Sequence, residues 1–277
     1  MPSLIDQYGV IGHPVAHSRS PFIHTRFAQA TGQQLSYNAF DVEPAGLAAF
    51  VSQFVARGGK GLNVTVPHKI DVAALVDSLS ERASRAGAVN TLVVEDGRIT
   101  GDNTDGIGLV RDLTANLGFE IGGKRILIAG SGGAVRGVLS PLLAMKPAAL
   151  VIAGRTPSKA VQLVEQFSDL GRITGCALDA AASGGAFDLV INATSAGLSG
   201  DVAAVPPAAV GPHTLCYDMM YGREETAFCA WARAQGAGRA VPGWGMLVEQ
   251  AAESFLLWRG VRPATAAVLA ALKAGAA

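Results

Sequence analysis

Short apolar runs typical of β-strands alternate along the chain with longer alanine-rich segments of helical period. This alternation limits the fold more than any other feature, because strands repeatedly followed by helices form parallel sheets covered by helices. Glycine (34 residues) and proline (13 residues) separate the runs at short intervals. The pattern predicts an α/β protein, and 277 residues suit one large or two medium domains, each with its own core.

The predicted elements fall into two successive groups. In the first, strands are predicted at Tyr8–Ile11, Leu35–Phe40, Gly61–Val66, Thr91–Glu95 and Arg98–Thr100, and helices at Pro21–Ala30, Pro44–Ala56 and Ile70–Leu79. Asp96-Gly97 marks a hairpin between the last two strands. After a helix ending near Asn116, the second group has strands at Arg125–Ala129, Ala149–Ala153, Arg172–Ala177, Phe187–Ile191 and Thr214–Tyr217, and helices at Ala134–Met145, Pro157–Phe167 and Glu224–Gln235. Two helices are predicted between Trp244 and Ala274, split at Gly260–Pro263.

Composition excludes several functional classes. A chain with 49% hydrophobic and 16% charged residues is neither disordered nor fibrous, and 22 Lys plus Arg against 22 Asp plus Glu create no field for nucleic acid or an anionic membrane. No apolar stretch approaches the roughly 18 residues that span a bilayer, and the start does not resemble a signal peptide. Cys176, Cys216 and Cys229 have no metal-like spacing, so we expect no metal site and a cytoplasmic location.

A glycine-rich loop predicts a dinucleotide site. The apolar run Arg125–Ala129 leads into Gly130-Ser-Gly-Gly-Ala-Val-Arg136 and then into a predicted helix. Glycine allows the backbone to approach a pyrophosphate, and the N–H groups at a helix start bind its negative charge. Gly130 and Gly132 match the G-x-G-x-x-G spacing but Val135 takes the third position, so an ordinary strand-to-helix turn remains an alternative.

The next strand end favours NADP over NAD. A Rossmann unit for NAD usually places an acidic residue about 20 residues after the loop, where it binds the ribose 2′-hydroxyl. Here that place holds Gly154-Arg155-Thr156, followed by Lys159. Two cations and a hydroxyl suit a 2′-phosphate, with Arg155 stacking on or forking to it. The alternative is a solvated helix start without a ligand.

Three polar segments stand out in the first half: Gly12-His-Pro-Val-Ala-His-Ser-Arg-Ser-Pro21, Asn63-Val-Thr-Val-Pro-His-Lys69 and Gly101-Asp-Asn-Thr-Asp-Gly106. Each has a structural explanation. Ser20 before Pro21 suits a helix N-cap, Asp105 could cap the following helix, and Lys69 could be a solvated side chain.

Taken together, the polar and glycine-rich segments closely resemble the shikimate dehydrogenase family over nearly the whole chain. The motifs that carry the resemblance are Ser18-Arg-Ser-Pro21, Asn63-Val-Thr-Val-Pro-His-Lys69, Ala88-Val-Asn-Thr91, Gly101-Asp-Asn-Thr-Asp-Gly106, Gly130-Ser-Gly-Gly-Ala134, Arg155-Thr156, Ile191-Asn-Ala-Thr-Ser195, Tyr217-Asp-Met-Met-Tyr221 and Gly245-Met-Leu-Val-Glu-Gln250.

The resemblance implies a two-domain α/β protein. An α/β substrate domain would be built from both chain ends (1–104 and 242–277), with a Rossmann-type NADP-binding domain (105–241) inserted between them. It implies reversible reduction of 3-dehydroshikimate to shikimate by NADPH in aromatic amino-acid biosynthesis, with Lys69 and Asp105 as the catalytic pair. The implied substrate-binding residues are Ser18, Ser20, Asn63, Thr65, Asn90, Asp105, Tyr221 and Gln250. The implied cofactor-binding residues are Gly130, Ser131, Gly132, Gly133, Ala134, Gly154, Arg155, Thr156, Lys159, Thr194, Met219 and Gly243.

The sequence departs from the family pattern at a few positions. Gly154 stands where Asn is more frequent, Pro242-Gly243-Trp244 replaces a more usual Asp-Gly-Leu, and His13 and His68 replace frequent Asn and Phe. Alternatives are a quinate and shikimate dehydrogenase that uses NAD, and a sensing regulator that has lost the reaction, although loss of the catalytic Lys or Asp would mark the latter. A methylenetetrahydrofolate-type dehydrogenase has a similar plan but no evident use for the segment around Ser18. The oligomeric state is left open between monomer and homodimer.

Overall fold

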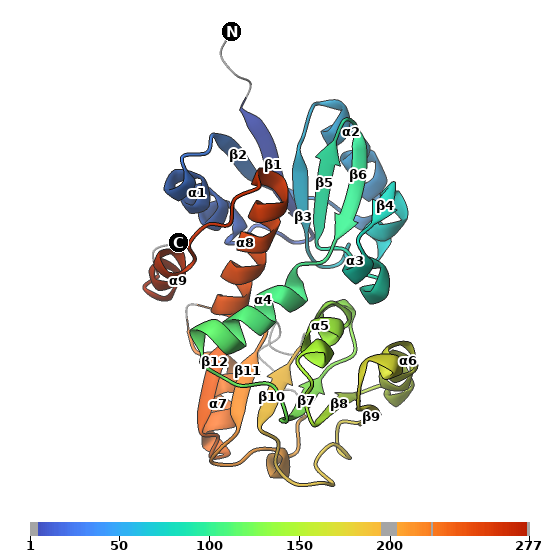
Figure 1. Ribbon diagram of the computed structural model, residues 1–277, viewed down its shortest axis with the longest axis vertical. Coiled ribbons are helices and arrows are strands. Elements are labelled where there is room, and N and C mark those ends of the chain that lie inside the picture. Colours follow the sequence, from blue (N-terminus) through green and yellow to red (C-terminus); the bar gives the residue numbers. More distant parts are fainter. Residues whose placement is uncertain (1–4, 195–203, 223, 276–277) are drawn as a thin grey trace. The chain divides into compact units, whose positions relative to one another are not determined.

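The structure is a computed structural model that describes residues 5–194, 204–222 and 224–275 (Figure 1). Ser195, in one of the family motifs, lies outside these residues. Contacts divide the chain into two compact units. The terminal unit comprises Met1–Gly108 and Leu247–Ala277, and the central unit comprises Leu109–Met246. The expected domain boundaries at 104 and 242 come a few residues earlier than these.

The terminal unit contains a six-stranded sheet in the order β2-β1-β3-β5-β6-β4. β1 is parallel to β2 and β3, whereas β5 is antiparallel to β3 and β6. The strands are β1 (Asp6–Gly12), β2 (Leu35–Asp41), β3 (Gly61–Val64), β4 (Ser78–Leu79), β5 (Thr91–Glu95) and β6 (Arg98–Asp102). The helices are α1 (Ser20–Thr31), α2 (Leu47–Ala56), α3 (Glu81–Ala86) and α9 (Ala266–Lys273), with α4 (Asp105–Arg111) and α8 (Trp244–Arg259) crossing into the other unit.

Both faces of β1 are covered from Tyr8 onward, which explains the run Tyr8-Gly-Val-Ile11 without a charged residue. Tyr8 and Val10 belong to a cluster against which Trp258 of α8 packs. Ile11 points to the opposite face, into a cluster with Leu47 and other residues of α2. The core thereby fixes the strand whose far end carries the first polar segment.

The central unit contains an all-parallel sheet in the order β12-β11-β10-β7-β8-β9. This is the doubly wound Rossmann order, whose switch point lies between β7 and β10. The strands are β7 (Arg125–Ala129), β8 (Ala149–Gly154), β9 (Ile173–Ala177), β10 (Leu189–Asn192), β11 (Leu215–Asp218) and β12 (Arg239–Pro242). The helices are α5 (Gly133–Ala144), α6 (Pro157–Phe167) and α7 (Ala227–Ala234). Side chains of β7 alternate between two clusters, Ile126 and Ile128 in one and Leu127 and Ala129 in the other.

The predicted α/β class is confirmed, and most predicted elements are present. The Asp96-Gly97 hairpin is confirmed, since both residues have positive φ (49° and 76°) between β5 and β6. The helix predicted over Ile70–Leu79 is wrong, because the segment forms a 3₁₀ turn (Asp71–Leu75) and then β4. Among the strands and α-helices of the described residues, β4, the short α3 and β12 were missed.

None of the helices within the described residues has the length and hydropathy that a membrane span requires. All three cysteines are free. Burial raises the pKa of the Cys216 thiol to about 12 and also raises that of Cys229. Thiols that stay protonated are poor nucleophiles, so these two act as small core residues.

Candidate functional site

Polar residues gather at one edge of the sheet in the terminal unit. β1 and β3 are parallel, so the segments that follow Gly12 and Val64 leave the sheet at the same edge. β5 is antiparallel to β3, and β6 is antiparallel to β5, so Asn90 before β5 and Asp102 at the end of β6 reach that edge too. The topology therefore brings the three polar segments of the sequence together.

Lys69 and Asp105 form an ion pair at this edge. Lys69 Nζ donates to Asp105 Oδ2 at 2.5 Å, and the two side chains are 17% and 6% exposed. Asp105 is the first residue of α4, and the sequence left open that its side chain only caps this helix. Its carboxylate oxygens are instead bonded by side chains, Oδ2 by Lys69 and Oδ1 by Asn90.

Asn90 links the pair to α8. Its Nδ2 lies 2.8 Å from Asp105 Oδ1 and 3.3 Å from Gln250 Oε1. Its Oδ1 accepts from the Thr104 backbone N–H (2.8 Å) and the Thr91 hydroxyl (2.8 Å). Asn90 is almost completely buried, so these bonds hold the amide, and with it the orientation of the Asp105 carboxylate.

Asn63 connects the cluster to α1. Its Nδ2 donates to Ser254 Oγ at 2.9 Å, and its Oδ1 accepts from the Tyr37 hydroxyl at 2.7 Å. The Tyr37 hydroxyl also bonds to Ser20. Burial raises the pKa of Tyr37 well above its ordinary value, so this phenol is neutral and can donate to Asn63.

Ser18 and Thr65 complete the residues predicted to bind substrate in this unit, and both are half-buried. Ser18 Oγ accepts from the backbone N–H of Ser20 at 3.3 Å, and α1 starts at Ser20, with Arg19 rather than Ser20 as its N-cap. Thr65 packs closely on Gly12, where an added Cβ would lie 2.4 Å from the threonine methyl group. A side chain at position 12 would thus displace Thr65.

Sequence reasoning missed the hydrogen-bonded side chains that hold the segment Asp102–Asp105 in place. Arg82 donates to both oxygens of Asp102, at 2.6 and 2.9 Å. Asp102 Oδ1 accepts from the Asn103 backbone N–H, and Asn103 Oδ1 accepts from that of Asp105. Burial alone would raise the pKa of Asp102, but bonds from Arg82 and Ser80 lower it below its ordinary value. Arg82 carried no signal because it lies in the helix that was not predicted.

The glycine-rich loop of the central unit has the shape that a pyrophosphate requires. Gly130 has φ +124°, and a Cβ there would come within 2.9 Å of the Ala193 carbonyl oxygen. A Cβ at Gly132, the N-cap of α5, would meet open space. The N–H groups of Val135 and Arg136 donate to the Gly132 carbonyl, so those of Gly133 and Ala134 precede the first bond of this 12-residue helix and have no partner within it. The loop therefore offers donors beside free space at the switch point, which fits a dinucleotide phosphate.

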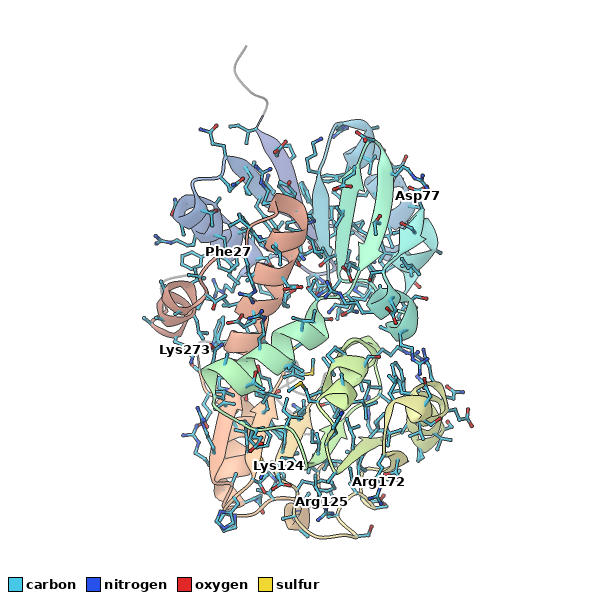
Figure 2. All side chains as sticks on the ribbon, in the orientation of Figure 1. Phe27, Asp77, Lys124, Arg125, Arg172 and Lys273 are labelled. Carbon is cyan, nitrogen blue, oxygen red and sulfur yellow. The ribbon has the colours of Figure 1, made fainter. Side chains whose placement is uncertain are left out.

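Arg155 directly follows β8 and Lys159 lies in the first turn of α6; both side chains are exposed and form no hydrogen bond or ion pair with any part of the chain that the structure describes. A Cβ at Gly154 would lie 3.2 Å from Ser131 Oγ, so the strand end lies against the phosphate loop. Lys124 and Arg125 lie at the opposite edge of the sheet, at the start of β7 (Figure 2), and both have partners: the Lys124 ammonium is 3.7 Å from Asp188 Oδ1, and the Arg125 guanidinium donates to the Ala186 carbonyl. The side chains of Arg155 and Lys159 are therefore available to an anionic ligand beside the phosphate loop.

The remaining predicted residues follow the strands beyond the switch point. Thr194 follows β10, Met219 follows β11, and Gly243 follows β12. Gly243 N–H donates to the Met220 carbonyl at 2.9 Å. Tyr221, predicted to bind substrate, belongs to the central unit, where its ring packs on Trp244 with centroids 4.7 Å apart.

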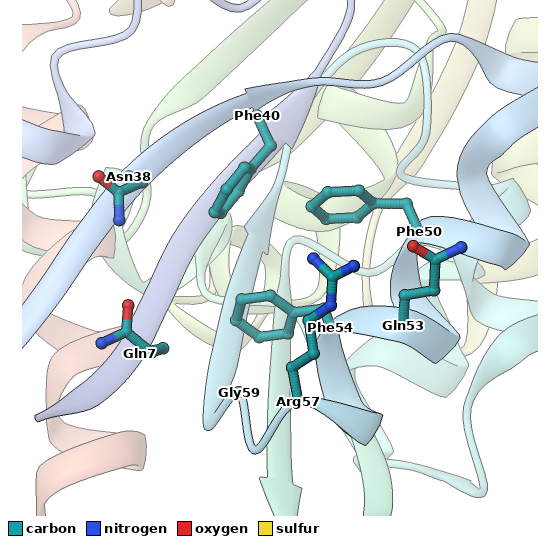
Figure 3. Close-up of a pocket in the computed structure, with 8 residues that line it drawn as sticks. All are labelled: Gln7, Asn38, Phe40, Phe50, Gln53, Phe54, Arg57 and Gly59. Atoms are coloured by element: carbon teal, nitrogen blue, oxygen red, sulfur yellow. The ribbon is translucent and has the colours of Figure 1, made fainter. Parts of the chain in front are cut away.

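Two other features are separate from these sites. A groove of about 280 Å³ in the terminal unit is lined by none of the predicted site residues, and Phe40, Phe50 and Phe54 form its apolar part (Figure 3). His13, which the sequence left unassigned, bonds Asp41 at 2.5 Å. Among the described residues, no group of three or more His, Cys, Asp or Glu side chains could hold a metal ion.

Family models match three stretches of the chain. Residues 10–92 match the shikimate dehydrogenase substrate binding domain, residues 113–199 match shikimate / quinate 5-dehydrogenase, and residues 243–273 match the shikimate 5'-dehydrogenase C-terminal domain.

Individual proteins match over nearly the full length. A shikimate dehydrogenase (NADP(+)) of Dechloromonas aromatica is 56% identical over 97% of this chain and 98% of that protein. One of Alkalilimnicola ehrlichii is 54% identical over 98% of this chain and 99% of that protein. The structure of shikimate 5-dehydrogenase from Thermus thermophilus in complex with NADP(H) and shikimate has a TM-score of 0.87 and 32% identity, covering 98% of this chain and 99% of that one.

Proposed function

The chain belongs to the shikimate dehydrogenase family and is an NADP-dependent oxidoreductase, and from this premise we propose that it reversibly reduces 3-dehydroshikimate to shikimate. We propose further that the reaction serves aromatic amino-acid biosynthesis, in the synthesis of chorismate. The observation that carries the proposal is the ion pair of Lys69 and Asp105, enclosed by neutral hydrogen-bonding side chains.

Reduction of a ketone requires a hydride at the carbonyl carbon and a proton at its oxygen. NADPH, when bound, supplies the hydride. Lys69 Nζ donates the proton to the oxygen, and in the reverse direction the amine takes the proton from the hydroxyl of shikimate. Asp105 stabilises the ammonium form and, held by Asn90, fixes the direction of the donor.

The neighbouring side chains suit a small carboxylate with several hydroxyls. Such a ligand requires a partner for each polar group, because unpaired buried polar groups are costly. Hydroxyls of Ser18 and Ser20 bind the carboxylate in this proposal. The ring hydroxyls and the carboxylate bond the remaining residues, which are Asn63, Thr65, Asn90, Asp105, Tyr221 and Gln250.

The residues of the central unit fit NADP. The loop Gly130–Ala134 binds the pyrophosphate through backbone N–H groups, and Arg155, Thr156 and Lys159 bind the 2′-phosphate. Gly154, Thr194, Met219 and Gly243 complete the proposed cofactor residues. We keep a cytoplasmic location and a monomer or homodimer as predictions, the former supported by the three free cysteines.

An absorbance assay at the NADPH band tests the function, with shikimate or quinate each offered with NADP or NAD. The proposal expects the highest kcat/KM with shikimate and NADP. Activity with quinate alone, or a preference for NAD, would favour the quinate dehydrogenase alternative. No turnover with any pair would favour the sensing regulator, although both Lys69 and Asp105 are present.

A further inference from the structure

Two buried side chains connect the loops that follow β10, β11 and β12. Asn192 ends β10 and Asp218 ends β11, and each is 1% exposed. Neither was predicted as a site residue. The loops that they join carry Thr194, Met219 and Gly243, three of the residues proposed to bind NADP.

Asn192 holds two of these loops. Its Oδ1 accepts from the backbone N–H of Thr194 at 3.1 Å and from the Thr194 hydroxyl at 2.8 Å. Its Nδ2 donates to Asp218 Oδ1 at 3.0 Å, and its backbone carbonyl accepts from the Met219 N–H at 2.9 Å. The side-chain amide and the backbone carbonyl of Asn192 are thus all hydrogen-bonded, and these bonds fix the turns that follow β10 and β11.

Asp218 extends the network to the third loop. Its Oδ1 also accepts from the Met220 N–H at 3.1 Å, and the Met220 carbonyl accepts from the Gly243 N–H at 2.9 Å. A Cβ at Gly243 would lie 2.8 Å from the Met219 carbonyl oxygen, so the loops pack closely. Burial raises the pKa of Asp218 and outweighs the bonds from Asn192 and the Met220 N–H to its Oδ1, while its Oδ2 is buried with no hydrogen-bond partner among the described residues.

The doubly wound sheet binds one mononucleotide in each half. The half with β7, β8 and β9 carries the phosphate loop and Arg155, and therefore takes the adenosine part of NADP. The half with β10, β11 and β12 then takes the nicotinamide part. Asn192 and Asp218 are too deeply buried to contact it themselves.

We propose that Asn192 and Asp218 are positioning residues that hold Thr194, Met219 and Gly243 in place to bind the nicotinamide mononucleotide half of NADP. This rests on the proposed function, which assigns those three residues to the cofactor. Because the two side chains act through backbone turns at one end of the sheet, their loss should weaken one half of the cofactor site and leave the other intact.

Three variants test the idea. Asp218→Leu removes the acceptor for both Asn192 Nδ2 and the Met220 N–H. Asp218→Asn keeps an oxygen at that position and can retain both bonds. Asn192→Ala removes the acceptor of Thr194 and leaves the backbone bond to Met219, and it serves if Asp218→Leu does not fold.

The measurements are dissociation constants for NADPH and for adenosine 2′,5′-bisphosphate, a fragment that lacks the nicotinamide half. We expect Asp218→Leu and Asn192→Ala to bind NADPH about tenfold more weakly, from the loss of one or two hydrogen bonds, with the fragment unaffected. Asp218→Asn should stay within about twofold of wild type on the same reasoning.

Thr214→Val is the matched control, since it removes buried hydrogen bonds to Phe187 and Gly211 beside the opposite end of β11. It should lower the melting temperature and leave both dissociation constants unchanged. Unchanged NADPH binding in both Asp218→Leu and Asn192→Ala, or equal weakening of NADPH and fragment, would overturn the positioning role. A wild-type protein that binds the fragment and NADPH equally would overturn it too, whereas one that binds neither would overturn the proposed function itself.

Discussion

Lys69 Nζ and Asp105 Oδ2 lie 2.5 Å apart although 36 residues separate them in sequence. The pair is mostly buried, and Asn90 bonds the other oxygen of the carboxylate. A charge pair held in this way has one geometry, which a proton donor requires. We therefore predict that the two residues act as one acid–base unit.

Lys69→Ala should lower kcat by roughly 10² to 10⁴, the usual contribution of general acid–base catalysis, with a smaller change in the KM for shikimate. Asp105→Asn should cost a similar factor. The double variant should lose much less than the product of the single losses, as residues of one unit do. Lys60→Ala, an exposed lysine before β3, is the control.

Turnover and melting temperature together distinguish a catalytic role of Asp105 from a role as a helix cap. Asn is itself a good N-cap, so if Asp105 only capped α4, Asp105→Asn would keep both its turnover and its melting temperature. Wild-type kcat in this variant would therefore refute the catalytic assignment.

Arg155 should set the choice between NADP and NAD. Its side chain is exposed and unpaired within the described residues, at the strand end that we propose binds the 2′-phosphate. Arg155→Asp should raise the KM for NADP about tenfold or more, as expected for a lost bond to a charged group, and raise that for NAD much less. Arg172→Asp makes the same charge change before β9, at the opposite edge of the sheet (Figure 2), and should leave both values unchanged. Equal changes for the two cofactors in Arg155→Asp would contradict the assignment.

The sequence predicted which polar segments the structure brings together, but not the buried side chains that hold these segments in place. Lys69, Asn90 and Asp105 lie in short polar motifs, and the strands before and after them were predicted, so their meeting at one sheet edge follows from topology. Arg82 and Asp218 gave no comparable signal. Their importance depends on burial and on partners far along the chain, which no local pattern reveals.

The missed elements have a physical explanation as well. β4 has only Ser78 and Leu79, both exposed, so no alternating pattern marks it. α3 has six residues, too few for a helical period to be recognised, although Ser80 caps it by accepting from the Ala83 N–H. These elements form because β6 and Asp102 hold them.

Ser18 should contribute to binding and little to proton transfer. Its hydroxyl is half-buried and lies next to the start of α1, whereas Lys69 already has its partner in Asp105. Ser18→Ala removes a donor to the substrate carboxylate in the ground state and the transition state alike, so the KM for shikimate should rise while kcat changes little. Ser36→Ala, on β2, is a control hydroxyl deletion. A large fall in kcat at constant KM would be incompatible with a binding role.

His24 should make stability depend on pH. Its ring is fully buried and stacks on Tyr37, with centroids 4.2 Å apart and planes 4° apart. Burial lowers its pKa from 6.5 to about 3, outweighing the opposite effect of Asn63. The folded protein therefore keeps His24 neutral, while the unfolded chain binds a proton below pH 6.5.

The sign follows from proton uptake on unfolding. The free energy of unfolding is unaffected by His24 above pH 6.5. As the pH falls from 6.5 toward about 3, protonation of His24 in the unfolded chain lowers the free energy of unfolding by up to about 1.4 kcal/mol per pH unit. Urea unfolding between about pH 7 and pH 5, where most carboxylates stay ionised, measures this slope. His24→Phe retains a ring against Tyr37 and should flatten the profile by about one proton, whereas His213→Gln, at an exposed position, should leave it unchanged. A profile as steep in His24→Phe as in the wild type would show that His24 is not the group responsible.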